Sequence, residues 1–255
     1  MRRVVVTGLG VVSSIGNNAA EVTESLRNAK SGISRSEDFA EHGFKCQVWG
    51  QPKLDTTGMV DRRATRFLSQ GGQWNHIAML QAIADSGVEE SDISNERTGI
   101  IMGSGGPSTK TIVEAADTTR ENNSPKRVGP FAVPKAMSST ASATLATWFK
   151  IHGVNYSISS ACSTSAHCIG NAVEMIQWGK QDMMFAGGHE DLDWTMSNLF
   201  DAMGAMSSKY NDQAATASRA YDVNRDGFVI AGGAGVLVLE ELEHAKARGA
   251  KIYAE

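Results

Sequence analysis

The stretch Gly153–Gly170, GVNYSISSACSTSAHCIG, joins three patterns around a single cysteine. From Val154 to Ile158 the side chains alternate with the period of a half-buried strand, and Ser159–Ala161 are small enough for a sharp turn. After Cys162 the residues suit a first helical turn, and apolar side chains then recur at helical spacing up to Ile176. The stretch therefore predicts a strand, a turn and a helix with Cys162 near the helix N-terminus.

This position favours Cys162 as a nucleophile. Unpaired N–H groups and the positive end of the helix dipole favour the thiolate, which is the nucleophilic form of cysteine. The alternative is a buried structural cysteine, because free cysteine is among the most buried residue types. A disulfide to Cys168 is not predicted, since the two side chains face different directions on one helix. His167 is rotated about 140° from Cys162 on an ideal helix and is not predicted to be its base.

Composition narrows the class of protein. The chain has 255 residues, of which 41% are hydrophobic and 20% charged, as expected for an ordinary globular protein of one large or two small domains. Three widely spaced cysteines predict neither a disulfide framework nor a zinc site, and they fit a reducing cytoplasm. The net charge of −4 argues against bulk nucleic-acid binding. The apolar run at the N-terminus is short and is broken by Gly8 and Gly10, so we expect a first strand and no membrane segment.

Alternating strand and helix patterns predict an α/β fold with a mainly parallel sheet flanked by helices on both faces. The expected strands are Val4–Thr7, Thr98–Met102, Val154–Ile158, Met183–Ala186 and two antiparallel runs within Phe228–Glu240. The expected helices are Ala19–Ala29, Arg66–Ser86, Lys110–Glu121, Ser138–Phe149, the one after Cys162, and Glu241–Arg248. The last residues, Lys251–Glu255, look like the start of another strand, so we expect the chain to be part of a longer protein.

Two motifs resemble ligand sites but lack essential residues. Thr7–Gly10 is similar to a dinucleotide-binding turn, but the third glycine of that fingerprint would fall at Ser13, so no nicotinamide cofactor is predicted. Asp222–Gly227 is similar to the opening of an EF-hand loop, but the required glutamate would fall at Gly233. A hydrogen-bonded turn with an Arg225–Asp226 pair is expected there instead.

The segment SSACSTSAHCIGNAVEMIQWGKQD, residues 159–182, resembles the active-site region of β-ketoacyl-acyl carrier protein synthases, most closely the synthase I branch of these condensing enzymes. The resemblance continues through RRVVVTGLGVVSSIGN, DRRATRF, the Gly103–Gly106 loop, FDAMGAMSSKYN and the residues from Tyr221 to the end. It implies a thiolase-like layered fold of two similar halves. Residues 1–255 would be the N-terminal half with insertions, and the C-terminal half would be absent from this chain.

The resemblance also implies a mechanism. Cys162 would take an acyl group as a thioester from acyl carrier protein, and malonyl carrier protein would then lose carbon dioxide and attack that thioester. The Cys162 N–H would be one donor of the oxyanion hole. The absent half would supply two histidines and a lysine for decarboxylation, and none of the histidines of this chain is assigned that role. No metal or other cofactor is implied, because the phosphopantetheine arrives on the carrier protein.

The remaining site residues also come from the resemblance. The acyl pocket would be lined or gated by Gly106, Met137, Phe200 and Met203, for which plain core packing is the alternative. The carrier protein would dock on Arg62, Arg63, Arg66, Lys126 and Arg127, for which a solvated face is the alternative. A homodimer would form through the strand Val154–Ser160, with Pro134–Met137 near the pocket of the partner subunit.

Two positions depart from the branch. Ser163 stands where alanine is familiar, and His189 interrupts a more glycine-rich run before Glu190, so each brings a new polar group toward the site. Neither removes Cys162, and only the chain-length preference is put in doubt. A thiolase acting on coenzyme A thioesters is one alternative, against which the synthase I motifs and the basic cluster speak. A catalytically silent dimerisation half or partner subunit is another, although silent relatives replace the cysteine that this chain keeps.

Overall fold

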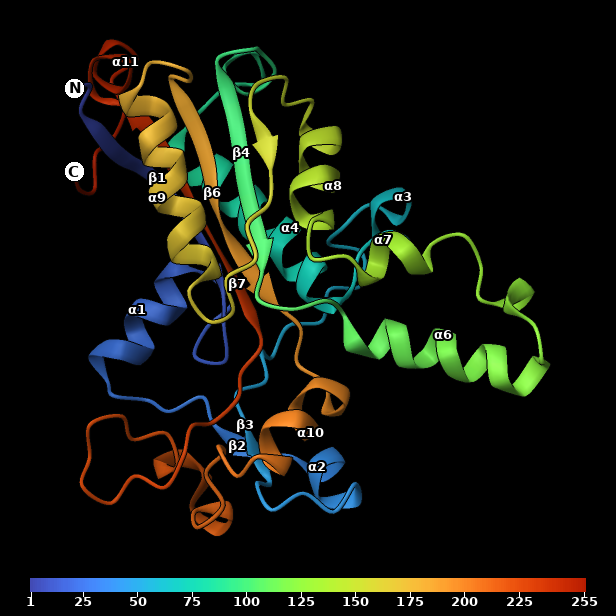
Figure 1. The fold of residues 1–255 in the computed structure, drawn as a ribbon. Helices are drawn as coiled ribbons and strands as arrows, with labels where there is room; N and C mark the ends of the chain where they lie inside the picture. Colours follow the sequence, from blue (N-terminus) through green and yellow to red (C-terminus); the bar gives the residue numbers. More distant parts are fainter.

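A five-stranded sheet organises the chain in the computed structural model, which describes all 255 residues (Figure 1). The strands are β1 (Val4–Val12), β2 (Ser34–Arg35), β3 (Val48–Trp49), β4 (Thr98–Ser104), β5 (Asn155–Tyr156), β6 (Met183–Glu190) and β7 (Gly233–Glu241). The main sheet has the order β1-β7-β6-β4-β5, while β2 and β3 form a separate pair. β7 is antiparallel to both β1 and β6, whereas β4 is parallel to β6 and β5. Four of the five strands therefore run in one direction.

Helices cover both faces of this sheet. The α-helices of the chain are α1 (Ala19–Arg27), α2 (Glu37–Glu41), α3 (Arg62–Thr65), α4 (Gln70–Ser86), α5 (Glu90–Ile93), α6 (Thr109–Asn122), α7 (Ala132–Ala136), α8 (Thr140–Phe149), α9 (Thr164–Gln177), α10 (Trp194–Ala202) and α11 (Leu242–Ala247), with short 3₁₀ helices η1 (Pro125–Arg127) and η2 (Asn211–Thr216). On one face α4 crosses β1, β7 and β6 and α8 packs on β4, whereas α9 covers β6 and β4 on the other face. The predicted α/β layering is confirmed.

Each face has its own hydrophobic core. A cluster of 22 buried residues, including Trp74, Ile100 and Phe185, fills the space between the sheet and α4 with α8. A cluster of seven, including Ile101 and Cys168, lies under α9. A third cluster joins α2, β3 and the segment after α10 beside the carboxyl ends of the parallel strands. None of the helices is both long and apolar enough to cross a membrane.

The glycines of the dinucleotide-like motif have a packing role in β1. A Cβ atom at Gly10 would lie 1.9 Å from the carbonyl oxygen of Ala78, and one at Gly8 would lie 2.7 Å from that of Ala82. Only glycine therefore lets the backbone of β1 approach α4 this closely. The sequence correctly predicts the strand, which extends to Val12, beyond the expected end at Thr7.

The arm comprising residues 109–136, which contains α6, η1 and α7, projects from the body of the molecule (Figure 1). No residue of α6 is buried, and Ile112 on this helix is 47% exposed. Helices within proteins gain most of their stability from packing an apolar face. Ile112 and the 68% exposed Val133 leave this arm with apolar surface that the chain itself does not cover.

Several element boundaries differ from the prediction. The helix expected over Arg66–Ser86 begins only at Gln70, because the Ser69 hydroxyl accepts from the Gly72 N–H at 3.3 Å and caps the helix there. The strand expected over Val154–Ile158 contains only Asn155–Tyr156. Beyond it, side-chain bonds hold the chain, such as the 2.8 Å contact between the Ser157 and Ser142 hydroxyls.

The secondary structure at the C-terminal end of the chain also differs from the prediction. Phe228–Glu240 does not form two strands, because the glycines continue into the single strand β7, which pairs with β6 on one side and β1 on the other. A Cβ atom at Gly187 of β6 would lie 2.0 Å from the Gly235 carbonyl oxygen, so these glycines allow close strand contact rather than a turn. Lys251–Glu255 forms no strand, and only Ala254 makes an isolated bridge to Val6.

The EF-hand-like loop is a hydrogen-bonded turn, as predicted, but it contains no Arg225–Asp226 pair. The Asp222 carboxylate accepts from the Asn224 N–H at 2.7 Å, and Arg225 donates to the Asp222 carbonyl at 2.8 Å. Asp226 instead accepts from the Ser207 hydroxyl at 2.7 Å and the Lys209 N–H at 2.8 Å. Its carboxylate therefore fixes a neighbouring loop.

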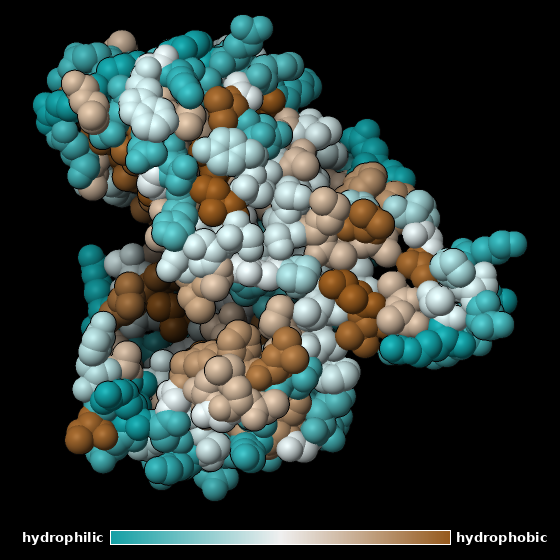
Figure 2. Space-filling view, viewed as in Figure 1, coloured by the Kyte–Doolittle hydropathy of each residue, from teal (hydrophilic) through white to brown (hydrophobic).

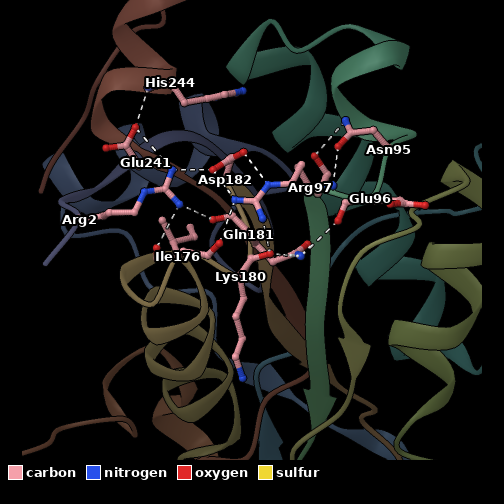
Figure 3. A network of polar contacts seen from close by, with 12 residues as sticks. Arg2, Asn95, Glu96, Arg97, Ile176, Lys180, Gln181, Asp182, Glu241 and His244 are labelled. Carbon is pink, nitrogen blue, oxygen red and sulfur yellow. Dashed lines mark hydrogen bonds and ion pairs between the residues drawn. The ribbon is translucent and has the colours of Figure 1, made fainter.

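A polar network closes the end of the sheet opposite to the cysteine (Figure 3). Asp182, between α9 and β6, accepts from Arg2 at 2.5 Å and from the Nε and a terminal nitrogen of Arg97 at 2.8 Å each. Arg97 also donates to the backbone carbonyls of Gly179 and Lys180 at 3.0 Å. Because Arg2 precedes β1 and Arg97 precedes β4, the network joins the starts of three strands. The bonds from Arg97 and Arg2 lower the pKa of Asp182 to about 2.

Candidate active site

Cys162 lies on an exposed turn between β5 and α9, at the carboxyl ends of the parallel strands. Ala161, the residue before it, has φ of +48°, a left-handed conformation that costs a non-glycine residue of the order of 1 kcal/mol. The N–H groups of Ser163 and Thr164 donate to the carbonyls of Ser160 and Ala161, each at 3.1 Å. α9 begins at Thr164, so Cys162 precedes the helix by two residues instead of opening it.

The hydroxyl of Thr164 closes this turn. It accepts from the Ser160 N–H at 2.7 Å and donates to the Ala161 carbonyl at 2.8 Å. The Cys162 N–H, in contrast, donates no hydrogen bond within the chain. It is therefore available to an oxygen atom of a bound molecule, beside the thiol.

Glycines let the backbone pack tightly around the turn. A Cβ atom at Gly103 would lie 2.1 Å from the Ile158 carbonyl oxygen, and one at Gly188 would lie 2.4 Å from that of Gly103. The Ser159 hydroxyl also donates to the Ser104 carbonyl at 3.1 Å. The ends of β4 and β6 thus support the segment that carries Cys162.

The three cysteines differ sharply in environment. All are free thiols, but Cys46 and Cys168 are completely buried whereas Cys162 is exposed. Burial raises the pKa of Cys46 and of Cys168. An external electrophile therefore reaches only Cys162 in the folded chain.

The structure brings the residues predicted for the acyl pocket to neighbouring segments. Gly106 follows β4, and a Cβ atom there would lie 2.9 Å from the terminal carbon of Met196 on α10. Phe200, on the same helix, packs edge-to-face on Phe228 with ring centroids 5.4 Å apart, and Met203 just after it is 73% exposed. Met196 was missed from the sequence, although it is one helical turn before Phe200.

Met137 directly follows the arm and is 51% exposed. The arm is held beside the Gly106 segment, because the Ser108 N–H donates to the Ala136 carbonyl at 3.0 Å. Figure 2 shows hydrophobic surface gathered where the arm meets the body. Met137 therefore follows directly the residue that contacts this segment in space, and its side chain is largely open to solvent.

Aromatic packing joins the two parts of the predicted basic cluster. Arg62 and Arg63 lie in α3 and Arg66 ends it, while Lys126 and Arg127 lie in η1 on the arm. The rings of Phe67 and Phe131 meet at 5.1 Å, and the Arg66 guanidinium lies 5.5 Å from the Phe131 ring centre. Arg63 is bound by Asp61 through two contacts of 3.2 Å. Arg66 is the member that directly contacts the arm.

His189 does not face Cys162. Successive residues of a strand point to opposite faces of the sheet, and the His189 ring lies against α4, 2.7 Å from where a Cβ atom of Gly71 would be. Burial lowers the pKa of His189. The next residue, Glu190, points to the face that carries Cys162 and accepts from the Gly105 N–H at 2.9 Å. Glu190 is thus a further site residue that motif reasoning did not single out, although strand alternation could have placed it.

An exposed cysteine on a strained turn at the carboxyl ends of parallel strands defines an α/β protein built to present a nucleophile. The chain belongs to the β-ketoacyl synthase family, since residues 1–245 match the family described as "Beta-ketoacyl synthase, N-terminal domain". This membership confirms the resemblance seen in the sequence.

Within this family, the chain is similar along its whole length to individual proteins of known name. It is 60% identical to 3-oxoacyl-[acyl-carrier-protein] synthase 1 of Escherichia coli strain K12 and 54% identical to the protein of the same name from Haemophilus influenzae. In both comparisons 100% of this chain aligns with 63% of the relative, so the chain spans less than two thirds of the length of these curated relatives.

Solved structures show the same fold. A crystal structure of a beta-ketoacyl synthase from Burkholderia phymatum STM815 superposes with a TM-score of 0.91 at 32% identity, covering 99% of this chain and 62% of that one. A type II polyketide ketosynthase in complex with its acyl-carrier protein gives 0.87 at 32% identity, covering 99% and 61%. The predicted thiolase-like layered fold is confirmed.

Proposed function

We propose that the protein is a β-ketoacyl-acyl carrier protein synthase, an acyltransferase that lengthens acyl chains in fatty acid synthesis. The observation that carries the proposal is Cys162, an exposed thiol whose own N–H is free, on a turn braced by two strand ends. The names of the relatives that match along the whole chain support the same chemistry.

In the first step the Cys162 thiolate attacks the carbonyl carbon of an acyl thioester. A new carbon–sulfur bond forms, the bond between the acyl carbon and the carrier sulfur breaks, and that sulfur leaves as a thiolate. The Cys162 N–H stabilises the negative oxygen of the intermediate. In the second step malonyl carrier protein loses carbon dioxide, and its carbanion attacks the acyl group on Cys162, which departs as thiolate. The product is two carbons longer. We assign decarboxylation to groups in the part of the relatives' length that this chain does not span.

The acyl chain would lie against Gly106, Met137, Phe200 and Met203. An alkyl chain needs an apolar channel, and the contact between the Gly106 segment and Met196 supports one beside the site. No metal or redox group is needed for these steps, and the phosphopantetheine would arrive on the carrier protein.

The carrier protein would dock on Arg62, Arg63, Arg66, Lys126 and Arg127. Such a partner brings acidic side chains and a phosphate group, which arginine binds well. The contact between Arg66 and Phe131 supports a continuous surface, because it joins α3 to the arm. A ketosynthase 32% identical to this chain forms a complex with its acyl-carrier protein.

We also propose that the protein forms a homodimer through Val154–Ser160 and acts in the cytoplasm. β5 is an edge strand of the sheet, so one side of its backbone has no strand partner. The arm, with its uncovered apolar side chains, provides further surface for a second copy.

The test is the intact mass of the protein after incubation with an acyl thioester of acyl carrier protein or of coenzyme A. We expect an acyl adduct from the carrier thioester that is lost in Cys162→Ala and kept in the control Cys168→Ala. An adduct from coenzyme A alone would indicate a thiolase. The absence of an adduct on folded protein would contradict acyl transfer and favour a silent partner subunit.

A further inference from the structure

We infer that Glu190 is a positioning residue, whose carboxylate holds the Ser104–Gly105 turn against Ala161 and so fixes the backbone that presents Cys162. The inference rests on Cys162 being the nucleophile of the proposed function. It adds a residue from β6 that neither touches the acyl group nor titrates in the reaction.

The contacts of Glu190 connect two segments. One carboxylate oxygen accepts from the Ser104 hydroxyl at 3.0 Å, and the other accepts from the Gly105 N–H at 2.9 Å. The Ser104 hydroxyl oxygen also lies 2.7 Å from the Gly106 carbonyl oxygen, so its single proton is shared between the two acceptors. The end of β6 is thereby fastened to the turn that follows β4.

That turn presses on the residue before the nucleophile. A Cβ atom at Gly105 would lie 2.7 Å from a carboxylate oxygen of Glu190 and 2.9 Å from the Ala161 carbonyl oxygen. Gly105 is therefore sandwiched between Glu190 and the residue with φ of +48°. A strained conformation persists only where its surroundings hold it, and Glu190 closes one side of these surroundings.

The position of the Glu190 carboxylate costs free energy. Burial and the negative charge of Asp191 raise the pKa of Glu190. Hydrogen bonds from Gly105, Ser104 and Gly106 oppose this shift, and no lysine or arginine contributes. Placing a half-buried carboxylate without a neighbouring cation costs free energy, which its hydrogen bonds must offset. A charge-only role near Cys162 would also oppose the thiolate, so the geometry points to bracing.

The experiment compares Glu190→Ala, Glu190→Gln and the control Glu41→Ala, an exposed carboxylate without a hydrogen bond, in the full chain. Iodoacetamide, a neutral reagent, is followed by intact mass. One label reports the folded protein and three labels the unfolded protein, because Cys46 and Cys168 are buried. The rate of the single label measures the presentation of Cys162 without relying on condensing activity.

We expect Glu190→Ala to slow the single labelling by about tenfold, because the turn loses its brace. Glu190→Gln should restore most of the rate, since its oxygen can accept from Gly105 and its amide can donate to the Ser104 hydroxyl. Equal rates for the alanine and glutamine variants would show that only charge matters and would overturn the inference. So would an unchanged rate in Glu190→Ala.

If Glu190→Ala takes three labels, it has unfolded, and its labelling rate no longer tests the inference. The variant Ser104→Ala then provides the test. This variant removes one hydrogen bond of the brace and should slow labelling by a smaller factor, whereas an unchanged rate would overturn the inference. A failure of acyl transfer in unaltered protein would contradict the proposed function alone, because the labelling rates need no carrier protein.

Discussion

The Thr164 hydroxyl bridges Ser160 across the cysteine turn, accepting from its N–H at 2.7 Å while it donates to the Ala161 carbonyl at 2.8 Å. Thr164 is 3% exposed, so water cannot easily replace either bond. One buried side chain thus satisfies the two backbone groups on which the turn depends.

Thr164→Val tests this bridge. The substitution keeps the volume but leaves the Ser160 N–H without its acceptor, which should lower the free energy of unfolding by about 1 kcal/mol and slow alkylation of Cys162. Urea denaturation and intact mass measure the two effects. Thr164→Ser keeps the hydroxyl and serves as the control, and equal stability of the valine variant would contradict the role of the bridge.

Asp182 should make the protein sensitive to acid. Its folded-state pKa of about 2 lies below the usual value of 3.8, so its contribution to stability is complete above pH 4 and is lost as the pH falls toward 2. Asp182→Asn should therefore cost about 1–2 kcal/mol at pH 7, discounted for partial exposure, and almost nothing near pH 2. Denaturant titrations at several pH values measure this difference.

The exposed Asp212, which makes no hydrogen bond, provides the control variant Asp212→Asn. Its stability should follow that of the unaltered protein at every pH. A constant penalty for Asp182→Asn between pH 7 and pH 2 would show that the arginine contacts do not stabilise the carboxylate form.

Two glycine-to-alanine variants should have opposite effects. A Cβ atom at Gly10 would overlap the Ala78 carbonyl of α4, so Gly10→Ala should cost about 3 kcal/mol or more. Gly170 lies exposed within α9 with no atom within 4 Å of the Cβ position, and Gly170→Ala should add about 0.5–1 kcal/mol. Thermal denaturation measures both, and a destabilised Gly170→Ala would show that this face of α9 is in contact with something.

Asn155→Pro tests the proposed dimer. The Val154 carbonyl accepts from the Ile100 N–H at 2.7 Å, so the alternate residue Asn155 turns its own N–H to the free edge of β5. Proline removes that donor and should convert the dimer to monomer, whereas Asn155→Ala keeps it and should remain dimeric. Analytical ultracentrifugation gives the mass, and a dimeric proline variant would place the interface elsewhere.

Local patterns predicted the parts of the fold that depend on neighbouring residues. The alternation before Cys162 and the helical spacing after it correctly indicated the strand, turn and helix, although the strand is short because its residues beyond Tyr156 bond to side chains. The glycines at 232, 233 and 235 look like a turn in sequence. In the structure Gly235 lies inside β7, where the backbone of Gly187 requires space, and only the neighbouring strand creates that requirement.

For the candidate active site, too, the sequence predicted the features that depend on neighbouring residues. Cys162 could be identified because the turn that exposes it is local. The bracing by Glu190 could not be predicted from the sequence, because it depends on β4 and β6 lying side by side. The orientation of His189 could not be predicted either, because it depends on the residue at which β6 begins. The roles of the acyl-pocket residues and the basic cluster stay predictions, since their geometry here shows proximity rather than binding.

The position of β7 between β1 and β6 has a consequence for how the chain folds. β1 pairs with no other strand of the main sheet, so during synthesis it cannot pair until β7, residues 233–241, has also been made. Closing so long a loop carries a large entropic cost, and contacts between residues far apart in sequence slow folding. During synthesis β1, with its apolar side chains, is an open edge that invites association with other chains until β7 arrives.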